Sequence, residues 1–65
     1  MTRTITNLRR RAKTRIAKLD RHSHALAMLL NDLWLIKHGA AQHESMAYRM
    51  HEHLRLADAE LGGAA

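Results

Sequence analysis

The sequence contains no cysteine and no proline, and its three glycines stand at positions 39, 62 and 63. Without cysteine, neither a disulfide nor a thiolate metal site can stabilise this chain of 65 residues. A domain of such a length buries only about 60% of the surface that its unfolded chain exposes. Oligomerisation is therefore an economical way for it to complete a core.

Aromatic residues are scarce as well, with one tryptophan, one tyrosine and no phenylalanine. Sheets are rich in aromatic and β-branched residues, whereas Ala, Leu and Arg, which dominate here, favour helices. The longest apolar run, 25–30, is much shorter than the roughly 20 residues that cross a bilayer. We expect an all-α, cytoplasmic protein that makes no membrane contact.

Apolar residues recur in steps of three and four along almost the whole chain, as at the a and d positions of a heptad. Arg15 and His22 are the exceptions in its first half. This register predicts helix over most of the sequence. Its members are Ile5, Leu8, Ala12, Leu19, Leu26, Leu29, Leu33, Ile36, Ala40, His43, Ala47, Met50, Leu54, Ala57 and Leu61.

Gly39 follows two basic residues and has the features of a helix C-terminus. We predict one domain, a helical hairpin with a long first helix over about 5–37 and a shorter second helix over about 41–61. A disordered tail would cover 62–65. A single long coiled-coil helix is the alternative.

Apolar residues outside the heptad register make the region around 26–36 apolar on nearly all sides, which suits contact with a second protein surface. Two hairpins packed through this region would form a four-helix bundle. The sequence thus predicts a homodimer or an apolar partner surface. Its residues would be Leu26, Leu29, Leu30, Leu33, Trp34, Ile36, Met50 and Leu54.

Positive charge is concentrated at one end of the chain. The first 21 residues hold eight basic side chains against Asp20 alone, a net charge of +7, whereas the rest sums to −2. Such a split indicates an anionic partner or an electrostatically steered docking surface. In the hairpin the second helix is too short to cover 1–15, so this segment would project as a cationic arm. The candidate binding residues are Arg3, Arg9, Arg10, Arg11, Lys13, Arg15, Lys18 and Arg21.

The run 6–15 places cations on several faces of a helix and brings like charges together, as at Arg9 and Lys13. Phosphates would relieve this repulsion. In composition the run resembles the arginine-rich RNA-binding helices of phage antiterminator peptides. The predicted architecture is similar to the Rop-type RNA-binding dimers of plasmids. These resemblances imply a regulatory protein that binds nucleic acid.

The alternative is an inhibitor of the kind that phages and mobile elements encode. Such a protein would bind a host protein, for example a transcription factor, in fixed stoichiometry and block its activity. Small size, excess apolar surface and steering charge agree with this hypothesis too.

Six histidines include the pairs His22/His24 and His51/His53, whose spacing directs the two rings to different helix faces. His22 and His43 fall on the predicted register, so acid would weaken an assembly that buried them in neutral form. The sequence has no HExxH motif, no Gly-rich phosphate loop and no catalytic constellation. We expect no metal, no cofactor, no small-molecule substrate and no enzymatic activity.

Overall fold

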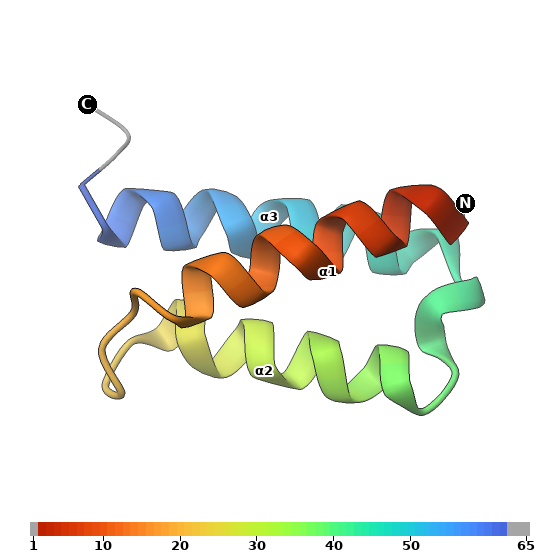
Figure 1. Cartoon of the computed structure of the whole chain (residues 1–65), viewed down its shortest axis with the longest axis horizontal. Coiled ribbons are helices and arrows are strands. Elements are labelled where there is room, and N and C mark those ends of the chain that lie inside the picture. Colours follow the sequence, from red (N-terminus) through yellow and green to blue (C-terminus); the bar gives the residue numbers. More distant parts are fainter. Residues whose placement is uncertain (1, 63–65) are drawn as a thin grey trace.

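A computed structural model of the chain describes residues 2–62. Its three α-helices, α1 (Thr2–Ile16), α2 (His24–Lys37) and α3 (Glu44–Glu60), run antiparallel in turn, and a short 3₁₀ helix, η1 (Ala40–Gln42), precedes α3. Each α-helix contacts the other two (Figure 1). The described chain has no strand, which confirms the predicted all-α class. None of its helices combines the length and hydropathy of a bilayer-spanning segment.

The long first helix predicted from the heptad register is interrupted at 17–23, and this part of the prediction is corrected. Asp20 closes a local turn: its Oδ1 accepts the backbone N–H of His22 at 2.8 Å, and its carbonyl accepts that of Ser23 at 2.9 Å. The Ser23 hydroxyl then caps α2 by accepting the N–H of Leu26 at 3.0 Å. Aspartate and serine compete with helix in this way. The chain therefore turns although the apolar spacing continues.

The predicted turn at Gly39 is confirmed. This residue has a φ of +106°, a left-handed conformation that glycine adopts at little cost, and its N–H donates to the carbonyl of Ile36 at 3.1 Å. The alternative of one continuous helix is thus wrong. Because η1 follows the turn, the helix expected over about 41–61 occupies Glu44–Glu60. Of the tail expected over 62–65, only Gly62 is among the described residues.

Helix α1 belongs to the core, which corrects the expectation of a projecting arm. The break at 17–23 lets α1 fold back onto α2 and α3, so that its aliphatic stripe is buried. Complete burial of a leucine or isoleucine stabilises a fold by about 1.5–3 kcal/mol, a gain that a free arm would forgo. The buried apolar residues are Ile5, Leu8, Ala12, Ala25, Leu29, Ile36, Met46, Met50, Leu54 and Ala57.

A core role for α1 predicts the effect of shortening one of its leucines. Leu8 is 2% exposed, so Leu8→Ala should lower the free energy of unfolding by about 2–4 kcal/mol. Thr4→Ala, on an exposed position of the same helix, should change it by less than about 0.5 kcal/mol. Urea unfolding followed by circular dichroism measures both. Equal effects of the two substitutions would contradict the packing of α1 in the core and favour a projecting arm.

Candidate nucleic-acid interface

The exposed side of α1 carries a dense group of positive charges. Its aliphatic stripe faces inward, so the basic side chains occupy the remaining circumference of the helix. The sequence of α1 contains no acidic residue. We call this group the α1 cationic surface, and it consists of Arg3, Arg9, Arg10, Arg11 and Lys13, all of them exposed.

Arg15, also predicted as a binding residue, is instead paired within the molecule. Its Nε donates to Oδ1 of Asp58 on α3 at 2.5 Å, and the two side chains are 26% and 39% exposed. The hydrogen bond from Arg15 lowers the pKa of Asp58. The positive charges of Arg15, Arg11 and Lys18 act in the same direction, while partial burial opposes them. Arg15 therefore positions α1 against α3, and its charge is not available to an external ligand in the way that the exposed cations are.

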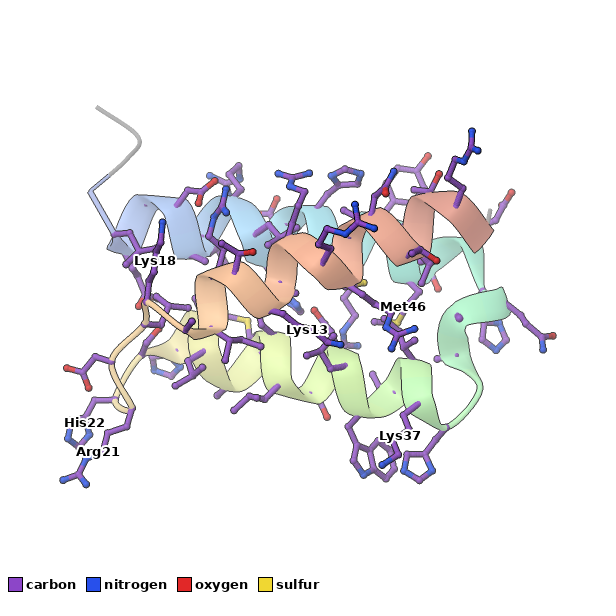
Figure 2. The ribbon with its side chains drawn as sticks, viewed as in Figure 1. Lys13, Lys18, Arg21, His22, Lys37 and Met46 are labelled. Atoms are coloured by element: carbon purple, nitrogen blue, oxygen red, sulfur yellow. The ribbon has the colours of Figure 1, made fainter. Side chains whose placement is uncertain are left out.

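The other two predicted cations, Lys18 and Arg21, lie outside the helices. Both are exposed in the turn that joins α1 to α2 (Figure 2). The structure thus divides the eight predicted residues into three groups: five on the α1 cationic surface, one in an ion pair, and two at the turn.

Two other carboxylates of α3 are engaged away from this surface. Glu60, at the end of α3, accepts the hydroxyl of Ser23 at 2.5 Å and the backbone N–H of Ala25 at 3.1 Å. Its charge lies at the N-terminus of α2, where the helix dipole favours an anion. Glu52 pairs with Arg55 on its own helix. Within residues 2–62, no carboxylate hydrogen-bonds to a side chain of the α1 cationic surface.

The most deeply buried polar group is the carboxylate of Asp32 on α2, which is 0% exposed. Its Oδ1 accepts Nε of Arg49 at 2.8 Å, and its Oδ2 lies 2.5 Å from Nδ1 of His53. Both partners belong to α3. A buried charge requires such partners, and every buried side-chain nitrogen or oxygen of the described residues has one. This network joins one flank of α2 to α3.

Sequence reasoning missed Asp32 and Glu60 as structural residues. A signal for Asp32 existed: it lies three residues after Leu29 and four before Ile36, and so falls on the inward stripe of an apolar helix. For Glu60 no local signal existed, because its partners are 35 and 37 residues away.

The two histidines on the predicted heptad register are exposed in the single chain. His22 is exposed in the turn before α2, and His43 is exposed at the N-cap of α3. The largely buried histidine is His53, whose side chain is 13% exposed beside Asp32. His38 is exposed, and its ring centroid lies 4.1 Å from that of Trp34. Residues 2–62 contain no cluster of side chains that could hold a metal ion.

Only part of the predicted apolar partner surface faces solvent. Leu30 and Trp34, one turn apart on α2, are 50% and 57% exposed. Leu26 and Leu33 beside them are half-buried. Tyr48 is exposed on α3, next to Glu44 and His51, and does not extend the α2 group. The remaining predicted residues, which lie in the core of the single chain, are Leu29, Ile36, Met50 and Leu54.

Comparisons of the chain with protein-family models, with curated proteins and with solved structures give no match. The geometry of these surfaces is therefore the basis for inferring what the protein binds.

The pKa of Asp58 predicts a pH-dependent contribution to stability. Because this pKa is lower in the folded than in the unfolded chain, the ion pair stabilises the fold above the ordinary aspartate pKa of about 4. The contribution disappears as the pH falls through the lowered folded value. Arg15→Gln should cost up to about 1 kcal/mol at neutral pH, since the pair is partly exposed, and progressively less in acid. Urea midpoints across the acid range measure this, with Lys37→Gln as a control whose cost stays constant.

The Asp32 network predicts unequal roles for two neighbouring histidines. His53→Leu would leave Oδ2 of Asp32 buried without its partner and should lower the free energy of unfolding by about 2–3 kcal/mol. His51→Leu, the same change at an exposed site of α3, should cost less than about 0.5 kcal/mol. Adding Asp32→Leu to His53→Leu should recover part of the loss, because the buried charge is then gone. Equal costs at 51 and 53 in chemical denaturation would contradict this account.

Proposed function

We propose that this protein is a small non-enzymatic regulatory protein that binds nucleic acid through the α1 cationic surface. The observation that carries the proposal is the exposure of five cations on one helix, none of which forms an ion pair with a carboxylate among the described residues. Contacts from Lys and Arg to phosphates release condensed counterions and supply most of the sequence-independent affinity for nucleic acid.

The packing of α1 limits how a nucleic acid would approach. One face of the helix is buried against α2 and α3, so a groove cannot enclose it on all sides, as the exposed arm expected from sequence would have permitted. A phosphate backbone would instead run along its outer side. A surface hollow lined by Thr6, Arg9, Arg10 and Lys13 offers a position for a phosphate. These contacts fix orientation and not base sequence.

A second candidate function, stoichiometric inhibition of a host protein, is favoured by a different observation. Leu30 and Trp34 remain half-exposed although the core is closed without them. Exposed apolar residues that cluster on one face are characteristic of protein contacts, and tryptophan is frequent among residues that dominate binding energy. The homodimer predicted from sequence stays a prediction, and its contact would be this same face of α2.

Nucleic-acid binding by five cations predicts a steep salt dependence. For duplex DNA the slope of log affinity against log salt should be about −4.5, at about −0.9 for each neutralised phosphate. Arg9→Ala combined with Arg10→Ala should reduce its magnitude by about 1.8. Fluorescence anisotropy of labelled duplex DNA and of structured RNA across a salt series measures the slopes.

The matched control removes two charges elsewhere, with Lys37→Ala combined with Arg55→Ala on α2 and α3. It changes the net charge by the same amount but should leave the slope within about 0.5 of the parent value. If the two double variants behave alike, net charge and not α1 directs binding. If the parent chain binds neither polymer at low salt, the nucleic-acid proposal is wrong and the protein-binding candidate takes its place.

A further inference from the structure

The ion pair of Arg15 shows which flank of α1 faces which neighbour. Arg15 reaches Asp58 on α3, and Arg11, one turn earlier, lies on the same flank and acts on the same carboxylate. Arg9 and Lys13 are also one turn apart but lie on the opposite side of the aliphatic stripe. That flank faces α2, and Lys13 lies between α1 and α2 in Figure 2.

The Asp32 network orients α2 in the same manner. Its flank with Asp32 faces Arg49 and His53 of α3. Successive residues of an α-helix advance by about 100°, so Leu26, Leu30 and Leu33 lie on the other flank, toward α1. Two cations of α1 and three leucines of α2 thus border the same side of the molecule.

We call this side the α1–α2 face. Trp34 extends it one turn beyond Leu30, and Lys37 continues it from Leu33. It combines an apolar strip on α2 with two cations of α1 along one side and one cation at the C-terminal end of α2. The face is defined by Arg9, Lys13, Leu26, Leu30, Leu33, Trp34 and Lys37.

We propose that the α1–α2 face binds an acidic amphipathic helix of a partner protein. The inference rests on the protein-binding candidate function and names its partner class. Leu26, Leu30 and Leu33 have the i, i+4, i+7 spacing of an apolar strip that packs along a partner helix. Trp34 supplies a large apolar anchor. Cations at the margin attract an acidic helix and set its position, as polar rims do at interfaces.

Charge argues against a second copy of this chain as the occupant. The chain carries a formal net charge of +5. A copy seated on the α1–α2 face would bring its own Arg9, Lys13 and Lys37 toward the same three cations, and like charges in an interface are repulsive. Only two large apolar side chains of α2, Leu30 and Trp34, are substantially exposed. Stable homodimers bury far more extensive apolar areas.

The leucines of the α1–α2 face argue against a nucleic acid as its occupant. Phosphates are bound by cations and hydrogen-bond donors, and a strip of leucines would remain in contact with water. An acidic amphipathic helix satisfies both parts of the face at once. Since Arg9 and Lys13 also belong to the α1 cationic surface, such a partner would occupy two of the cations proposed for nucleic acid.

The experiment uses the full chain and the emission of Trp34, its only tryptophan. The probe is a synthetic helical peptide as long as α2, with leucines in steps of three and four and glutamates on both flanks. Two matched peptides carry glutamine or lysine in place of glutamate. We expect the glutamate peptide to shift the emission of Trp34 to shorter wavelength and to bind at least tenfold more tightly than either control peptide.

Protein variants locate the contact. Leu30→Glu, at an exposed site that should fold normally by circular dichroism, should weaken binding of the glutamate peptide at least tenfold. Leu30→Ala should weaken it less. Arg9→Ala combined with Lys13→Ala should reduce the preference for glutamate over glutamine. Tyr48→Glu, on the exposed side of α3, should alter affinity less than twofold.

Each contrary result has a defined meaning. Equal binding of the glutamine and glutamate peptides would overturn the acidic class of partner while leaving protein binding in place. If none of the peptides binds, both the acidic partner class and the protein-binding candidate function are contradicted. An emission shift that follows the concentration of the protein alone would overturn the proposal in favour of a second copy. A shift produced by duplex DNA but not by peptide would assign the face to nucleic acid.

Discussion

The buried carboxylate of Asp32 is the constraint on which the arrangement of the other surfaces depends. Two side chains of α3 hold it, and a rotation of α2 that moved it away from them inside the core would leave a buried charge without partners. Once that flank is fixed, Leu26 and Leu33 must lie toward α1, and Leu30 and Trp34 must remain at the surface. A buried ionic contact adds less to stability than its distances suggest. Its principal effect here is to select one orientation of the helix.

Much of the architecture was predictable because it depends on local chemistry and on spacing. The apolar register identified helix, and most of its residues are in the core or packed against it. Gly39 was identifiable as a turn because only glycine readily adopts its positive φ. The exposure of the α1 cationic surface follows from its residues lying outside that register. In each case the physical cause lies within a few residues of the feature.

The features that the sequence did not predict depend on competition between helix and turn, or on contacts between residues far apart in the chain. A heptad pattern cannot distinguish a continuous helix from two helices whose registers happen to agree, and the weak turn preferences of Asp20 and Ser23 decided between them. Folding back then became favourable because it buries Leu8 and its neighbours. The same break placed Arg15 beside Asp58 and brought α1 next to α2. One turn of the chain thus changed an expected cationic arm into a helix with an apolar inner face and a charged outer face.

The cap of α2 by Glu60 has a consequence for how the protein forms during synthesis. The carboxylate that completes the first turn of this helix stands 37 residues after the serine that begins it, and Asp58, the partner of Arg15, is made only shortly before it. While the ribosome is still adding these residues, α1 lacks its ion pair with α3, and the N-terminus of α2 has its Ser23 cap but not Glu60. Nascent domains fold as units once their parts are present. The three helices of this domain can therefore pack fully only after residue 60 has been added. Of the three, α1 is made first and so remains longest without its contacts.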